Sequence, residues 1–277
     1  MHALAFALLL TPLHTGLYSP LHWSGKMAPG TTLRVLNVRG DIHVTPASGA
    51  EATIDGEADA VLDVHVDGHT VTICVYRKGI DHCDANGIHG DHVDLAANGD
   101  DMDIDNGGGD PSGGADITVH LPPGVRIQVA SGNGHIVVTD AGSDVSAWSG
   151  NGDVRVTDAA GRVIARSGSG RVDVTTTGGP VNASTGTGAI DVTMGRVPQP
   201  SDMHFSTGNG TITVTLPATY TGELEASTAR GAVTSDFPLQ AIGHATPQHV
   251  HATIGGGGVA GRLRLETGDG DLVVRKS

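Results

Sequence analysis

The segment 129–192 repeats one short pattern four times: VASGNGHIVV (129–138), AWSGNGDVRV (147–156), ARSGSGRVDV (165–174) and ASTGTGAIDV (183–192). Each copy contains a small-Gly-x-Gly turn, and the second glycines follow one another at intervals of 18 residues, at Gly134, Gly152, Gly170 and Gly188. Looser copies surround Gly40, Gly210, Gly231 and Gly270. Self-similarity at a fixed period is typical of repeat proteins, in which each unit buries its apolar face against its neighbours.

Apolar residues flank every turn at fixed positions. Counted from the second glycine, positions −7, −5, +2 and +4 are apolar in all eight copies, with Ser235 as the one exception. The residues between them, such as Ser146, Asp153 and Arg155, are mostly polar. Alternation with a period of two indicates two short strands per copy, each with one buried face.

Two architectures fit this pattern. The Asn-Gly turns at Asn133, Asn151 and Asn209 are typical of β-hairpins and would give an antiparallel meander. Alternatively, each unit is one coil of a parallel β-solenoid, in which every strand stacks on its equivalent in the next coil.

The outward-facing charges favour the solenoid. Parallel stacking would place Asp153 beside Arg171, and Arg155 beside Asp173, as two cross-strand ion pairs. A meander would not bring these positions together. One contact speaks against stacking, because Asp191 would then stand beside Asp173. We therefore expect an all-β chain that forms a parallel β-solenoid with repeats of about 18 residues.

A hydroxyl residue occupies position −3 in seven copies and could be mistaken for a row of nucleophiles. Catalysis needs one activated hydroxyl beside a base, whereas a ladder of equivalent hydroxyls is suited to capping backbone groups at a corner. The pattern therefore predicts a structural ladder, formed by Ser131, Ser149, Ser167, Thr185, Thr207, Thr228 and Thr267.

The composition excludes several classes of protein. Among 277 residues there are 42 glycines, only 3 Phe, 3 Tyr and 2 Trp, and a formal net charge of −14. An acidic chain is a poor match for the phosphates of nucleic acid, and few aromatic side chains are present on which bases could stack. We expect no nucleic-acid partner.

The apolar run from Ala3 to Leu10 has the length of a signal-peptide core. No Lys or Arg precedes it and no A-x-A cleavage site follows it, so a first strand or a misassigned start codon is the alternative. We expect residues 1–22 to be an export segment and residues 23–277 a single solenoid domain. No apolar stretch reaches the length of a bilayer span, so we expect an extracytoplasmic protein without a transmembrane segment in the mature chain.

The chain contains two cysteines, Cys74 and Cys83. In Val71–Val75 the alternation places Cys74 on the face opposite the apolar residues, where it can meet a returning loop. In an exported protein such a pair predicts a disulfide that closes a short loop. The alternative is a thiolate metal site that includes His82, although structural zinc normally uses more closely spaced cysteines.

Several further segments accompany the Gly-Asn-Gly repeats: Trp23-Ser24-Gly25, Gly40-Asp41-Ile42, Val71–Cys74 with Cys83, Leu121–Val125, Ser235–Pro238 and Thr253–Gly258. Together with the repeats, this ordered set resembles the bacterial putative-adhesin family of β-strand-repeat proteins, formerly of unknown function. The resemblance extends from about residue 23 to the end of the chain. It implies a right-handed parallel β-solenoid in an exported or envelope-facing protein, and it brings no catalytic residues with it.

Residues 81–116 depart from the repeat as an acidic insert, for which we expect a solvated loop. Asp101, Asp103 and Asp105 have the spacing of a calcium loop. However, Asn106 stands at the sixth position and Ser112 at the twelfth, which excludes an EF-hand. A looser calcium site is the alternative to the solvated loop.

The same insert could hold a transition metal through histidines and aspartates, but no helix or hairpin in the sequence fixes their geometry. We therefore expect no metal site and no cofactor. The residues concerned are His82, His89 and His92 with Asp81, Asp84 and Asp91.

Two functions remain for a chain of this kind. The first is a non-catalytic, adhesin-like or envelope-associated module that binds a polysaccharide or protein ligand. The second is a polysaccharide lyase or hydrolase, because such chemistry needs carboxylates and a cation on one sheet face. The residues available for it are Asp153, Arg155, Arg171, Asp173 and Asp191, with Trp148 as the one aromatic sugar platform. Since the charges in that patch pair with one another, we expect no catalytic site.

Overall fold

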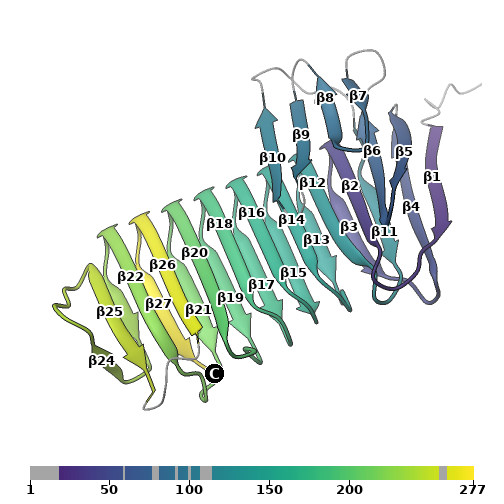
Figure 1. Ribbon diagram of the computed structural model, residues 1–277. Helices are drawn as coiled ribbons and strands as arrows, with labels where there is room; N and C mark the ends of the chain where they lie inside the picture. The colour runs from purple at the N-terminus through teal and green to yellow at the C-terminus, as the bar shows by residue number, and fades with distance from the viewer. Residues whose placement is uncertain are drawn as a thin grey trace, which may run out of the picture.

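The protein is described by a computed structural model that covers residues 19–58, 60–76, 81–90, 93–98, 101–106, 114–255 and 261–277. Two long sheets lie face to face along the molecule, and a smaller third sheet stands at the N-terminal end (Figure 1). Among the described residues, the structure contains no helix long and apolar enough to span a bilayer. Residues 1–18 of the predicted export segment lie outside the described residues, whereas residues 19–22 begin the strand β1 (Ser19–Lys26), in which Leu21 is buried in the core.

Sheet A has 11 strands and is largely parallel. In spatial order it contains β1 (Ser19–Lys26), β4 (Glu51–Ala58), β11 (Ile117–Leu121), β3 (Ile42–Pro46), β13 (Ile136–Thr139), β15 (Val154–Ala159), β17 (Val172–Thr176), β19 (Ile190–Met194), β21 (Ile212–Leu216), β27 (Leu272–Lys276) and β23 (Val233–Ser235).

Sheet B has 12 strands and is also largely parallel. In spatial order it contains β24 (Leu239–Ala241), β25 (His249–Ile254), β22 (Gly222–Arg230), β26 (Gly261–Asp269), β20 (Ser201–Asn209), β18 (Val181–Thr187), β16 (Val163–Ser169), β14 (Val145–Asn151), β12 (Arg126–Asn133), β2 (Thr32–Arg39), β6 (Thr70–Tyr76) and β5 (Val61–Asp67).

Equivalent residues of successive units lie beside one another, as in a β-solenoid. In sheet A, Val154 pairs with Val172 and Val172 with Ile190, in parallel register. In sheet B, Ala147 pairs with Ala165 in the same way. The expected parallel stacking is therefore confirmed, and the antiparallel meander is excluded for these strands.

The inward-facing residues form one continuous core between the two sheets. Every apolar position counted from the repeat glycines is buried except Val233, which lies with Ser235 in the short β23. The side chains are mostly Val, Ile, Leu and Ala, and Phe205 is the largest that is fully buried. Small β-branched residues suit this position because they fill the narrow space between two sheets.

The repeat glycines are required by the close approach of neighbouring coils. A Cβ atom on Gly152 would lie 2.3 Å from the carbonyl oxygen of Gly134, and the φ angle of Gly152 is +148°. A side chain would therefore be strained by both the contact and the backbone conformation. Packing between neighbouring coils therefore explains the glycine at this corner, and a phosphate-binding loop is not required to explain it.

The predicted hydroxyl ladder is confirmed. Ser149 Oγ donates to the carbonyl of Gly134 at 2.8 Å, Ser167 Oγ to that of Gly152 at 2.8 Å, and the remaining members repeat the contact. In the coil of Gly40 the equivalent residue is Asn37, whose amide donates to the carbonyls of Gly40 and Ala115. These side chains satisfy backbone carbonyls that the turn leaves free.

The order of the coils in space departs from their order in the sequence at both ends. β26 lies between β20 and β22, and β27 lies between β21 and β23, so the C-terminal copy is inserted into the solenoid. At the other end β2 pairs with β12, and β3 pairs with β13, although about ninety residues separate them in the chain. The early copy around Gly40 is thus the coil that adjoins the copy around Gly134.

Candidate functional site

The acidic insert is not a simple solvated loop. It contains four strands, β7 (Asp81–Cys83), β8 (Gly87–Gly90), β9 (Val93–Asn98) and β10 (Asp101–Asn106), which pair antiparallel in the order β10-β9-β8-β7. We call them the accessory sheet. It lies against the outer face of sheet B, alongside β2, β6, β12 and β14 (Figure 1).

A second hydrophobic core explains why the insert folds on sheet B. Ile88 and Leu95 of the accessory sheet are fully buried against apolar residues that point outward from sheet B. In most coils those outward positions are polar, whereas here they are filled by Leu36, Val38, Cys74, Tyr76, Ala130 and Trp148. Burial of these groups stabilises the accessory sheet, and the many acidic residues of the insert concealed this from the sequence.

A disulfide joins Cys74 to Cys83, as the sequence predicted. Cys74 is fully buried and belongs to β6 of sheet B, while Cys83 ends β7 of the accessory sheet. The bond therefore ties the accessory sheet covalently to the solenoid. It also removes the alternative of a thiolate metal site at these two residues.

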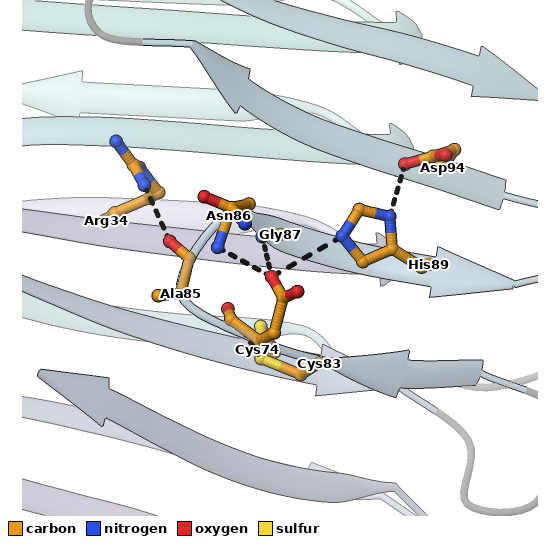
Figure 2. Close-up of polar contacts among 9 residues, drawn as sticks. Arg34, Cys74, Cys83, Ala85, Asn86, Gly87, His89 and Asp94 are labelled. Atoms are coloured by element: carbon orange, nitrogen blue, oxygen red, sulfur yellow. Dashed lines mark hydrogen bonds and ion pairs between the residues drawn. A yellow bond between two sulfur atoms is a disulfide. The ribbon is translucent and has the colours of Figure 1, made fainter. Parts of the chain in front are cut away.

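Asp84 organises the turn between β7 and β8 (Figure 2). Its carboxylate accepts hydrogen bonds from the backbone N–H groups of Asn86, at 2.6 Å, and Gly87, at 3.1 Å. The bond from Asn86 is the main reason why the pKa of Asp84 lies below its ordinary value, and His89 adds to the effect. Asp84 therefore stays ionised and holds the turn closed.

His89 stands between two carboxylates on the accessory sheet (Figure 2). Its Nδ1 lies 3.0 Å from Asp94 Oδ1 and its Nε2 lies 3.5 Å from Asp84 Oδ1. The ring of His82 is close by, with 5.4 Å between the two ring centroids. The two carboxylates, one imidazole and neighbouring His82 form a polar surface with both donors and acceptors, which we call the His89 cluster.

A buried arginine links the solenoid to the same turn. Arg34 of β2 donates from Nε to Gln128 Oε1 at 2.9 Å. Its Nη1 donates to the carbonyl of Ala85 at 3.2 Å (Figure 2). Burial lowers the pKa of Arg34 from its ordinary value. Sequence reasoning missed this contact, because Arg34 occupies an ordinary outward position of the alternating pattern.

The metal hypotheses find no support in the described side chains. Among them, no group of three His, Cys, Asp or Glu residues is arranged to hold a metal ion. Both ring nitrogens of His89 face carboxylates. The side chains of Asp81, Asp91 and His92, and those of the calcium candidates Asp101, Asp103 and Asp105, lie outside the described residues.

The charged patch on the outer face of sheet A is held by its own ion pairs. Arg155 lies 3.3 Å from Asp173, as expected, and Arg171 lies 2.8 Å from Asp191. The expected ion pair between Asp153 and Arg171 is wrong, since Asp153 instead accepts the backbone N–H of Arg171 at 2.8 Å. Asp173 and Asp191 stand side by side without conflict, because each has its own arginine.

Trp148 does not adjoin that patch. It belongs to β14 of sheet B and lies in the second core, where only 3% of its surface is exposed. The patch, by contrast, is on sheet A, around a shallow hollow of about 270 Å³. The expectation that Trp148 could serve as a sugar platform beside Asp153 and Arg155 is therefore wrong, because the accessory sheet covers it.

Comparison with known proteins gives matches in structure only. No family model matches the chain, and no curated protein matches it in sequence. A crystal structure described as a putative cell adhesion protein from Clostridium sporogenes has 11% identity and a TM-score of 0.41, and the match covers 94% of this chain and 100% of that one. A putative adhesin from Bacteroides fragilis has 12% identity and a TM-score of 0.42, with coverage of 92% and 97%.

These matches carry the same description as the resemblance found in the sequence. Each covers more than 90% of this chain. At such low identity and TM-score, the function has to be argued from the residues of this chain.

Proposed function

We propose that the chain is a non-catalytic, exported, adhesin-like module of the cell envelope that binds a polysaccharide or protein ligand through the accessory sheet. The solenoid then serves as a rigid scaffold. The observation that carries the proposal is the attachment of the accessory sheet, by the Cys74–Cys83 disulfide and a second core, to an otherwise uniform surface. Binding groups on a rigid support lose little freedom when a ligand arrives.

The groups that could support catalysis already have structural partners. The hydroxyl ladder donates to backbone carbonyls, and the arginines of the sheet A patch pair with Asp173 and Asp191. The groups of the His89 cluster are also paired with one another, but they lie on the accessory sheet with both carboxylates exposed and the imidazole partly exposed. Polar groups of this kind suit the hydroxyls of a sugar or the backbone of a protein ligand.

A binding screen with matched variants tests this proposal. The full chain, with its cysteines oxidised, is passed over immobilised envelope and host polysaccharides and proteins, with and without EDTA. We expect saturable retention that weakens more than about fivefold in His89→Ala, a loss of about 1 kcal/mol. His135→Ala, which changes an exposed histidine of the solenoid body, is the matched control and should bind normally.

Three outcomes would redirect the proposal. Release of reducing or unsaturated sugar ends would overturn the non-catalytic function, and Asp153→Asn, Asp173→Asn and Asp191→Asn would then locate the catalytic group. Loss of retention in EDTA that added calcium restores would assign the ligand site to a calcium ion held by the insert. Equal loss of binding in His89→Ala and His135→Ala would move the site away from the accessory sheet.

The proposal also includes export of the chain and the handedness and repeat length of its coils. We infer that residues 1–22 direct export, and that the coils wind right-handed with repeats of about 18 residues. A fusion of residues 1–22 to alkaline phosphatase should be active, since that enzyme matures only after export. An inactive fusion that is well expressed would overturn export through this segment, and an experimental structure would decide the handedness.

A further inference from the structure

The two long sheets end in four edge strands, which are protected to different degrees. An edge strand exposes unpaired N–H and C=O groups and invites pairing with another chain unless it is short, charged with lysine or interrupted by proline. β23 and β24 have three residues each, and β1 carries Pro20 and Lys26. β5 has seven residues, VLDVHVD, with neither proline nor lysine, and in the described structure it pairs on one side only, with β6.

β5 also exposes apolar side chains. Val64 is 38% exposed and Val66 is 71% exposed, and among the described residues the only other large apolar side chain of this kind is Ile242. Val64 pairs with Ile73, and Val66 with Val71, so both valines point to the core side of sheet B. β5 is the last strand of sheet B at this end of the molecule, where sheet A continues past β3 with β11, β4 and β1 (Figure 1).

We propose that β5 pairs antiparallel with β5 of a second copy of this chain, about a two-fold axis at Val64. In that register Val64 meets its own equivalent and Val66 lies opposite Leu62, so the apolar residues are placed together on one face. On the other face His65 lies opposite Asp63, and this pair occurs twice. A two-fold axis makes the contact closed, so the assembly stops at a dimer.

Charge complementarity selects this register over its neighbours. An axis one residue later, at His65, would set Asp63 opposite Asp67, and like charges directly opposite one another are destabilising. An axis at Asp63 would set the two copies of that aspartate against each other. The hydroxyl of Tyr76 donates to Asp63 and orients its carboxylate on the outer face of the sheet.

Association of the full chain in solution tests the dimer. The contact surface is small, so we expect a dissociation constant on the order of micromolar, measured by analytical ultracentrifugation. Val66→Lys should raise that constant more than about tenfold, because each lysine would face Leu62 of the other copy and the contact occurs twice. Ile242→Lys is the matched control, since it alters an exposed apolar residue at the opposite end of the solenoid and should leave association unchanged.

Cysteine cross-linking tests the register. Val64→Cys should form a disulfide-linked dimer under mild oxidation, whereas Asp67→Cys should not, because its two copies would lie about 20 Å apart at roughly 3.4 Å per residue. A chain that stays monomeric at all concentrations would overturn the dimer. If the amides of β5 are nevertheless protected from hydrogen exchange in that monomer, the edge is covered by the chain's own N-terminal segment, and the dimer is overturned as well. Dissociation by Ile242→Lys as strong as by Val66→Lys, or equal cross-linking of both cysteine variants, would overturn it as well.

Discussion

In the body of the solenoid, each strand from β13 to β21 has an equivalent strand bonded on both sides, and one coil supplies the partners of the next. The accessory sheet has no such neighbours. Its strands are short, two fully buried residues, Ile88 and Leu95, anchor it, and one disulfide joins it to sheet B. The body is therefore stabilised collectively, whereas the accessory sheet is stabilised by a few identifiable contacts.

This difference predicts which region of the molecule tolerates amino-acid substitutions. A substitution at a repeat corner disturbs two neighbouring coils, because each corner packs on the carbonyl of the preceding one. A substitution in the accessory sheet affects only a local unit that can open without the rest. A binding surface can therefore vary on the accessory sheet while the scaffold stays intact, which is consistent with the proposed function.

Among the substitutions considered, Gly152→Ala is expected to lower the stability of the folded chain the most. Its Cβ would lie 2.3 Å from the carbonyl oxygen of Gly134, at a backbone conformation that L residues rarely adopt. We expect the free energy of unfolding to fall by more than about 3 kcal/mol, measured by urea denaturation. Gly142→Ala is the control, because no atom lies within 4 Å of its added Cβ. A change of less than about 1 kcal/mol in Gly152→Ala would show that the coils can separate at little cost.

The second largest effect is expected from removal of the Cys74–Cys83 disulfide, which should destabilise the accessory sheet alone. Cys74 and Cys83 are nine residues apart, and the chain-entropy model gives about 2–3 kcal/mol for a loop of this size. In the double variant Cys74→Ser/Cys83→Ser we expect amides of β8 and β9 to exchange about 100-fold faster, with no change in β15 to β19. Reduction of the wild-type protein should reproduce this result. Faster exchange throughout the body would contradict the separation of the two regions.

The repeat carried most of the information that the sequence offers about the body. Alternation around the glycines predicts the strands and the buried positions, and the charges at Arg155 and Asp173 predict the parallel register. The insertion of β26 and β27 between earlier coils could not be predicted, because the copies around Gly210, Gly231 and Gly270 follow the same pattern and fit any order of stacking.

The accessory sheet was missed for a different reason. Its acidic composition is typical of a solvated loop, and among its described side chains only Ile88 and Leu95 are buried in the second core, with the partly buried Cys83 packed against it. A signal was nevertheless present on sheet B, where Leu36, Ala130 and Trp148 occupy outward positions that hold polar residues in most coils. Apolar residues on the outer face of a repeat predict a covering element, and the insert is the segment available to cover them.

A smaller effect is expected from one rung of the hydroxyl ladder. Ser167→Ala removes the donor to the Gly152 carbonyl and leaves that acceptor without its side-chain partner. We expect a loss of about 1 kcal/mol in urea denaturation. Ser169→Ala, two residues further along β16, is the control because its side chain is exposed. If both variants unfold alike, the ladder does not stabilise the body.

The smallest effect concerns acid stability at the C-terminal end of the body, where the antiparallel β25 joins β22. Glu223 Oε1 lies 2.5 Å from His251 Nε2, and Arg262 lies 3.6 Å from the other carboxylate oxygen. The hydrogen bond to His251 is the main cause that holds the pKa of Glu223 below its ordinary value of 4.5.

A carboxylate with a lowered pKa in the folded state stabilises the protein above its unfolded pKa, and this contribution is lost as the pH falls through the folded pKa. Glu223→Gln should therefore lower the melting temperature at pH 6 and converge with the wild type in acid, as Glu223 of the wild type becomes protonated. The difference at pH 6 should be at most about 1 °C, because the pair is partly exposed to solvent. Glu51→Gln, an exposed residue of β4, is the control. If Glu223→Gln and the wild type kept a constant difference at every pH, the loss would come from packing at β25, and the C-terminal end would then resemble the accessory sheet in depending on a few local contacts.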